Sequence, residues 1–183
     1  MPETLDLASY FERIAYQGPI APTLDTLRAL HLLHPSAIAF ESIDPLLGRP
    51  VAIDSAAVRA RLVAGSRGGY CHEHNLLFHD VLAAIRFRAG ALGARVAWMA
   101  QGRTNPRTHR LTLVDRPQGR FVADVGFGGQ TPTAPPGGPR GACSGAGGLD
   151  GPGTSGAGRG AVGTPAGRAG AALAVMARNG VFA

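Results

Sequence analysis

A chain of 183 residues with 45% hydrophobic and 16% charged residues is long and apolar enough for one globular domain, or one and a half, with a buried core. Its formal net charge is +6 and every basic residue is arginine, but the arginines are scattered without runs or interleaved aromatic residues, which argues against a nucleic-acid partner. No segment reaches the length of a membrane span, the acidic N-terminus lacks an apolar signal core, and two cysteines make no disulfide framework, so we expect a cytoplasmic protein with free thiols.

Helical periodicity dominates the first 88 residues. Apolar residues recur every three or four positions in two segments, namely Leu7, Tyr10, Phe11 and Ile14, and then Leu24, Leu27, Leu30 and Leu33. A Gly-Pro pair ends the first helix, and the second is expected to be capped by Thr23 and to end at Pro35. Two more helices are expected, over 55–65 with Ser55 as the cap and over about 72–87.

Cys71 follows two glycines, Gly68 and Gly69, and precedes the last of these helical runs. Two glycines before a helix indicate a tight turn, so Cys71 is expected at a helix N-terminus. Unpaired N–H groups and the helix dipole favour the thiolate there, and the thiolate is the nucleophilic form of cysteine. The position therefore favours a nucleophile, with a buried structural cysteine as the alternative.

The apolar period then changes from helix to strand. ALGARVAWMA, THRLTLV and RFVADVGF alternate as strands do, and Arg116-Pro117-Gln118-Gly119 is expected to join the last two as a hairpin. If the hairpin folds about Arg116-Pro117, His109 lies opposite Asp124 and Leu111 opposite Val122. Side chains that face each other in this way allow a carboxylate to accept from an imidazole N–H.

A thiol nucleophile needs a base, and the base needs an orienting group, so we interpret Cys71, His109 and Asp124 as a catalytic triad. The alternative for His109 and for Asp124 is an ordinary surface polar residue. A one-residue bulge in either strand would also break the register on which their pairing depends.

The segment RGGYCHEHN at 67–75 resembles the RGGxCxExN signature of the arylamine N-acetyltransferases of bacterial type. The likeness covers about residues 5–135: SYFERI and the sequence up to VAID are similar to the family's N-terminal helical domain, and PRTHRLTLV and FVADVGFGGQTPTAP resemble its β-barrel segment. The resemblance implies an α+β fold, in which a helical bundle is followed by an antiparallel β-barrel in a cysteine-protease-like arrangement, and then by an α/β lid. The domains expected are a helical domain with the nucleophile over 1–88, a partial β-barrel with the His and Asp over 89–135, and a Gly/Ala/Pro-rich tail over 136–183.

The resemblance also implies a reaction. Cys71 would take the acetyl group from acetyl-coenzyme A, and an aromatic amine or hydrazine would then remove it in a ping-pong sequence, with His109 as the base and Asp124 orienting it. The substrate-binding residues implied are Phe40 for the amine and Gly126, Phe127 and Gly128 for the acyl donor. The supporting residues implied are Arg67 and Glu41, as a structural ion pair, and Asn75 behind the nucleophile.

His72 departs from the family pattern, which usually has an aromatic residue such as Phe there. Together with its neighbours it forms the run Cys71-His72-Glu73-His74, which invites interpretation as a metal site. Adjacent residues of a helix cannot all face one ion, so no metal is expected.

From Pro136 onward the chain consists mainly of Gly, Ala, Pro, Ser and Arg and no longer resembles the family. We expect disorder over 136–168, a weak helix over 169–177, and a missing lid domain, with a reading-frame shift near codon 135 or a wrong gene model as the cause. Three other interpretations stay open. The chain is an inactive truncated remnant, a thiol hydrolase that uses the same triad without coenzyme A, or a basic binding module, which only the pI of about 10.6 supports.

Overall fold

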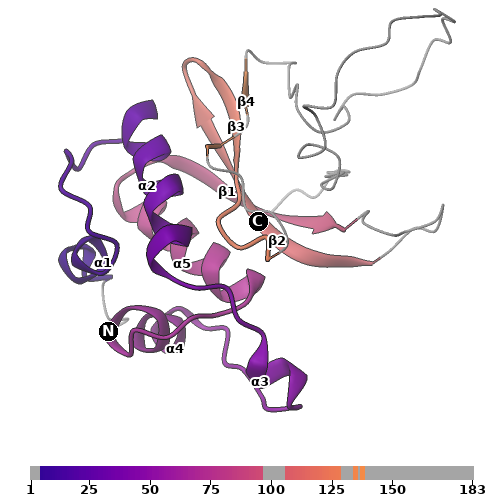
Figure 1. The fold of residues 1–183 in the computed structure, drawn as a ribbon. Helices are drawn as coiled ribbons and strands as arrows, with labels where there is room; N and C mark the ends of the chain where they lie inside the picture. Colours follow the sequence, from indigo (N-terminus) through magenta and orange to yellow (C-terminus); the bar gives the residue numbers. More distant parts are fainter. Residues whose placement is uncertain (1–4, 97–105, 129–133, 136, 139–183) are drawn as a thin grey trace, which may run out of the picture.

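The computed structural model describes residues 5–96, 106–128, 134–135 and 137–138 (Figure 1). The helices are α1 (Leu7–Arg13), α2 (Leu24–Ala37), α3 (Ile43–Leu46), α4 (Ser55–Arg59), the π-helical turn η1 (Ala60–Ala64) and α5 (Cys71–Ala84). The strands are β1 (Arg88–Arg95), β2 (Arg107–Arg116), β3 (Gly119–Ala123) and β4 (Gly137–Gly138). Helix α5 contacts α4 and also β1 and β2, so it joins the helical half of the molecule to the sheet.

Short polar side chains cap α1, α2 and α4, as residues of this kind are expected to do at an N-cap. The Thr23 hydroxyl accepts from the N–H of Thr26 at 3.1 Å, which confirms the expected cap of α2. The cap of α4 is Asp54 and not the expected Ser55, because the Asp54 carboxylate accepts from the N–H of Ala57 at 2.9 Å and Ser55 is already helical.

Two helices continue differently from the expectation. Pro35 does not end α2, which runs to Ala37, because the proline removes a single backbone N–H while the N–H of Ile38 still bonds to the carbonyl of His34 at 2.9 Å. The helix expected over 55–65 changes after Arg59 into the π-helical turn η1, closed by a 2.8 Å bond from the N–H of Gly65 to the carbonyl of Ala60. π-Helical turns are rare and often lie near functional sites.

The sheet is antiparallel and has the order β1-β2-β3-β4. Within the described residues it is open, so the expected barrel is not formed by these strands (Figure 1). β1 begins three residues before the first alternating segment, and residues 97–100 of that segment lie outside the described ranges. Of the tail expected over 136–168, the structure describes only the two residues of β4, which pair with β3, and the helix expected over 169–177 lies outside it.

The hairpin forms where it was expected, but its register is different. The loop is Pro117-Gln118, and Leu113 lies opposite Val122, where Leu111 was expected. The proline explains the difference, because its fixed φ suits the first position of a two-residue loop and is unfavourable at the second. Gly119 follows the loop with a φ of +140°, a conformation that residues with a Cβ rarely adopt.

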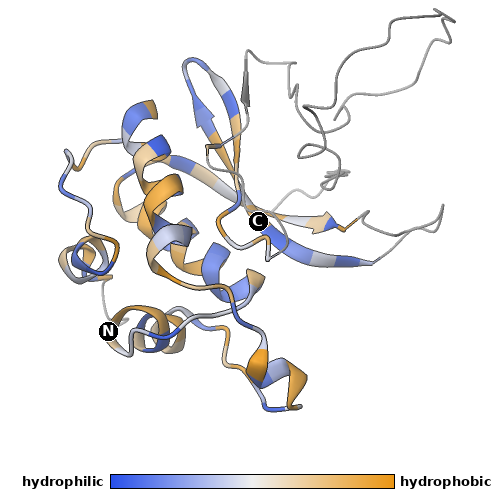
Figure 2. Ribbon diagram, in the orientation of Figure 1, coloured by the Kyte–Doolittle hydropathy of each residue, from blue (hydrophilic) through white to orange (hydrophobic). Residues whose placement is uncertain are grey.

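The main core lies between the helices and one face of the sheet. It unites α1, α2, η1 and α5 with the sheet through fully buried side chains, among them Tyr10, Leu27, Leu30, Leu62, Leu77, Phe78, Val81 and Val114. Helix α3 differs, since Ile43, Leu46 and the following Leu47 are exposed in a largely apolar segment (Figure 2). None of the described helices combines the length and the hydropathy that crossing a bilayer requires.

Candidate active site

Cys71 is the first residue of α5 and is partly exposed. The turn before it is held by Glu73, whose carboxylate accepts from the N–H of Tyr70 at 3.1 Å. This bond satisfies one of the helix's unpaired N-terminal groups and confirms that the Gly-Gly turn enters a helix. The Cys71 Sγ lies 4.0 Å from the carbonyl oxygen of Thr108, the residue before His109.

His109 and Asp124 meet in the buried part of the site. Their Nε2 and Oδ2 atoms are 2.6 Å apart, and the side chains are 3% and 1% exposed. The two residues are diagonal neighbours in the observed register and do not face each other directly, but a shift of two residues keeps both on the same face of the hairpin. His109 and Asp124 therefore meet in spite of the wrong register.

The charge balance at His109 favours the imidazolium. Burial alone would lower the pKa of His109, but the hydrogen bonds to Asp124 and to Cys71, together with the negative charges of these two groups, raise its pKa to about 9. A ring that a carboxylate holds through Nε2 keeps its Nδ1 available to take up a thiol proton.

Asn75 holds the Asp124 carboxylate. Its amide nitrogen donates to Asp124 Oδ1 at 2.9 Å and to the carbonyl of Arg110 at 2.6 Å, while its amide oxygen accepts from the N–H of Val125 at 3.1 Å. The N–H of Gly126 also donates to Asp124 Oδ1, at 3.2 Å. Asn75, expected behind the nucleophile, thus lies one helical turn after Cys71 and ties α5 to the end of β3.

The residues expected to bind substrate lie near Cys71, near His109 or next to His74. The Phe127 ring meets the His109 ring edge to face, with centroids 5.4 Å apart. Phe40 is 44% exposed, stacks on His74 and packs against Gly128, where a side chain would strike its ring. A Cβ on Gly126 would come within 3.1 Å of the Cys71 Cα, so glycine permits the close approach of this loop to the nucleophile.

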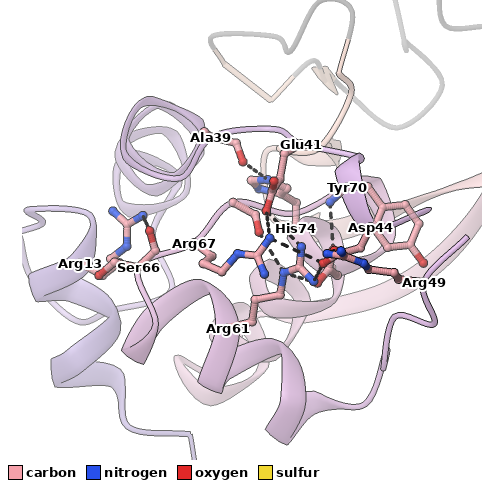
Figure 3. Close-up of polar contacts among 12 residues, drawn as sticks. Arg13, Ala39, Glu41, Asp44, Arg49, Arg61, Ser66, Arg67, Tyr70 and His74 are labelled. Carbon is pink, nitrogen blue, oxygen red and sulfur yellow. Dashed lines mark hydrogen bonds and ion pairs between the residues drawn. The ribbon is translucent and has the colours of Figure 1, made fainter. Parts of the chain in front are cut away.

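The ion pair expected between Arg67 and Glu41 is present at 3.1 Å, but it belongs to a larger network centred on Arg61 (Figure 3). The Arg61 guanidinium contacts Glu41 at 3.0 Å, Asp44 at 2.7 Å and Glu73 at 3.3 Å. It also donates to the carbonyl of Gly68 at 3.2 Å, within the turn that precedes Cys71. Nothing in the sequence separates Arg61 from the other arginines, because its contacts depend on the π-helical turn.

A second network, also missed from the sequence, runs from α1 to the Phe40 segment. The Ala39 carbonyl can only accept, so His74 Nε2 donates to it at 3.1 Å, and the neutral His74 Nδ1 accepts from His34 Nε2 at 2.9 Å. His34 Nδ1 is then left to accept from the Tyr10 hydroxyl at 2.9 Å. The available signal was the spacing of His34 from Leu27 and Leu30, which places a histidine on the apolar face of α2.

The stability of the fold is expected to fall on mild acidification. Burial lowers the pKa of His34 and His74 below the usual 6.5, and it lowers the pKa of His31 to about 4. The stability that these neutral rings contribute is fully present above pH 6.5 and is lost as the pH falls toward their folded values, at up to about 1.4 kcal/mol per pH unit for each ring. Two groups oppose the trend. Burial raises the pKa of Glu73, and the pKa of His109, raised to about 9, adds stability as the pH falls from about 9 toward 6.5, so most of the loss is expected below pH 6.5.

Urea unfolding followed by circular dichroism at about pH 7, 6 and 5 checks this, in a range above the ordinary titration of Asp and Glu. A free energy of unfolding that stays constant or rises across this range would contradict the assignment of neutral rings.

The metal interpretation of the run 71–74 finds no support in the geometry. His72 Nε2 lies 3.2 Å from the carbonyl of Thr108, whereas His74 Nε2 binds the carbonyl of Ala39, so the two rings reach different partners. Within the described ranges, no three His, Cys, Asp or Glu side chains are grouped so that they would hold a metal ion.

Residues 23–139 match the model of a family described as N-acetyltransferase. Among curated relatives, the chain is 46% identical to the arylamine N-acetyltransferase of Escherichia coli (strain K12) over 129 residues, which cover 70% of the chain and 46% of the relative. It is 47% identical to that of Mycobacterium tuberculosis (strain H37Rv) over 136 residues, covering 72% and 48%. The chain therefore spans about half the length of the curated relatives it matches.

Solved structures give the same result. The arylamine N-acetyltransferase from Salmonella typhimurium superposes with a TM-score of 0.70 at 44% identity, over 74% of this chain and 50% of that one. The Mycobacterium marinum arylamine N-acetyltransferase in complex with CoA gives a TM-score of 0.67 at 46% identity, again over 74% and 50%.

Proposed function

Because the chain belongs to the arylamine N-acetyltransferase family, we propose that it transfers an acetyl group from acetyl-coenzyme A to the nitrogen of an aromatic amine or hydrazine. The observation that carries the proposal is the His109 ring, which Asp124 binds at 2.6 Å through Nε2, while the Cys71 sulfur lies against the carbonyl of Thr108, the residue before His109. The solved relative in complex with CoA supports coenzyme A as the carrier of the acyl group. No metal takes part in the proposed reaction.

The proposed reaction has two half-reactions. In the first, His109 takes the Cys71 proton, the thiolate attacks the thioester carbonyl, the bond from the acetyl carbon to the coenzyme sulfur breaks, and the coenzyme thiolate recovers the proton from His109. In the second, the amine nitrogen attacks the acetyl-Cys71 thioester, the carbon–sulfur bond to Cys71 breaks, and the amine proton passes to His109. The N-terminal N–H groups of α5 would stabilise the oxyanion in each half-reaction.

Phe40 and Phe127 are proposed to contact the aromatic acceptor and the acyl donor, respectively, since the Phe127 ring meets His109 and the exposed Phe40 ring packs against Gly128 in the loop that follows Asp124. We also propose that the open sheet is part of a barrel that lies against the helical bundle, as in cysteine proteases. The domain boundary is proposed near residue 88, and the order of elements supports this boundary, because α5 ends at Ala84 and β1 begins at Arg88. A cytoplasmic location, where thiols stay reduced, completes the proposal.

Incubation with acetyl-coenzyme A followed by intact-mass analysis tests the function. We expect the mass of one acetyl group on the wild-type chain and on the Cys143→Ser variant, and no adduct on Cys71→Ser, because Cys71 is the proposed nucleophile. A folded wild-type chain that takes up no acetyl group would overturn the transferase proposal and favour an inactive remnant.

A thiol hydrolase remains the second candidate, because the triad alone also supports transfer to water. The same acetylated protein separates the two. Loss of the adduct only after an arylamine is added supports the transferase, whereas loss of the adduct in buffer alone supports the hydrolase.

A further inference from the structure

His31, on α2, is fully buried, and its ring reaches the segment that carries the orienting acid of the triad. The backbone N–H of Asp124 lies 3.2 Å from His31 Nε2 and donates to it. A ring nitrogen that accepts an N–H carries no proton of its own, so the neutral ring holds its proton on Nδ1. One tautomer of His31 is therefore fixed by the contact with Asp124.

This tautomer has a cost. The His31 Nδ1 finds no hydrogen-bond partner among the residues that the structure describes, and the Phe78 ring lies edge to face against the imidazole at 6.0 Å. A buried donor without a partner costs about 1–3 kcal/mol, which an aliphatic side chain of similar size would avoid. A histidine is therefore expected at this position only if its Nε2 lone pair accepts a hydrogen bond, which an aliphatic side chain could not do.

The backbone N–H of Asp124 needs such an acceptor. β3 ends at Ala123, so the N–H of Asp124 lies beyond the strand, in a residue that is completely buried. Without His31 this N–H would lose its hydrogen bond in a place that water does not reach, which is unfavourable. The carboxylate of the same residue already binds Asn75, Gly126 and His109, so its direction depends on where the backbone is held.

We propose that His31 is a positioning residue of the triad, which holds the backbone of Asp124 so that its carboxylate stays in line with the His109 ring. The proposal makes α2 a part of the active site, although no residue of α2 touches the Cys71 sulfur in the described contacts. It rests on the triad as a site, and it does not depend on the identity of the acyl donor or acceptor.

The tautomer of the wild-type ring tests the first step without any substitution. In the full chain labelled with 15N, the ring-nitrogen chemical shifts of His31 are expected to show a proton on Nδ1 and a bare Nε2. A proton on Nε2 would overturn the proposal, because that nitrogen could not accept from Asp124.

Three variants test the positioning itself. His31→Leu removes the acceptor, and His31→Gln keeps an acceptor oxygen within similar reach. His34→Leu is the matched control, because His34 is a buried histidine on the same helix but binds His74 and not Asp124. The readouts are the pKa of His109 by NMR titration and the rate at which iodoacetamide alkylates Cys71 at neutral pH.

In His31→Leu the pKa of His109 is expected to fall by about one unit and alkylation of Cys71 to slow about tenfold, as the imidazolium partner weakens. His31→Gln should keep both near wild-type values, and His34→Leu should lower stability with a smaller effect on His109. An unchanged pKa in folded His31→Leu, or an equal fall in His34→Leu, would overturn the proposal. If His31→Leu does not fold, the tautomer measured for the wild-type His31 ring tests the proposal in its place. Neither readout uses an acetyl donor, so failure of the acetylation experiment would leave this result standing.

Discussion

Replacement of Asp124 by asparagine is expected to slow acetylation of Cys71 by about 10³–10⁴-fold, because an amide in place of the triad carboxylate holds the base in the wrong tautomer. Asparagine has almost the same shape, and its oxygen can still accept from Asn75 and Gly126, which now bind Asp124 Oδ1 at 2.9 and 3.2 Å. Its amide nitrogen would then face His109 Nε2, 2.6 Å away in the wild-type site, as a donor. His109 would carry its proton on the side of Cys71 and could not accept the thiol proton.

The measurement is the single-turnover rate of acetyl transfer to Cys71, followed by mass, together with the alkylation rate of the thiol over a pH series. The pKa of His109, about 9 in the wild type, should fall in Asp124→Asn because the largest favourable contribution to it is the hydrogen bond to Asp124. Asp115→Asn is the matched control, since Asp115 lies on β2 in an exposed pair with Arg120. Equal rates in the wild type and in Asp124→Asn would remove Asp124 from the triad.

The sequence was sufficient to predict the contact between His109 and Asp124 for a reason that lies in strand geometry. The expected hairpin register was wrong by two residues, yet side chains alternate with a period of two, so His109 and Asp124 stayed on one face and within reach as diagonal neighbours. An error of one residue would have placed them on opposite faces. The position of Pro117 indicates the observed register, because proline suits the first position of a two-residue loop.

What the sequence did not reveal is the support around the triad. His31 and His34 repeat with the apolar stripe of α2, which shows that they are buried but not what they bind, since their partners are 24 or more residues away in the chain. Arg61 was hidden for a different reason. A regular helix over 55–65 was expected, and only the extra residue of the π-helical turn determines where the side chains after Arg59 point.

Arg61→Leu is expected to lower the free energy of unfolding by about 2 kcal/mol, between the effect of an exposed ion pair and that of a fully buried one, because the network is partly buried and its carboxylates stay behind. The Arg61 side chain is 17% exposed, and its loss would leave Glu41, Asp44 and Glu73 close together with less positive charge among them. The hydrogen bond to the Gly68 carbonyl would be lost as well, so the turn before Cys71 would also be less well held.

Arg67→Leu is the matched control, because Arg67 joins the same carboxylates through Glu41 and Asp44 but is 51% exposed. An exposed pair contributes at most about 1 kcal/mol, so this variant should unfold within that margin of the wild type. Arg61→Lys keeps the charge but not the planar fork that reaches several acceptors at once, and it should fall between the two. Urea unfolding of the three variants at neutral pH gives the comparison. If Arg67→Leu lowers the free energy of unfolding as much as Arg61→Leu does, the network is centred on Arg67, the arginine that the sequence singled out, and not on Arg61.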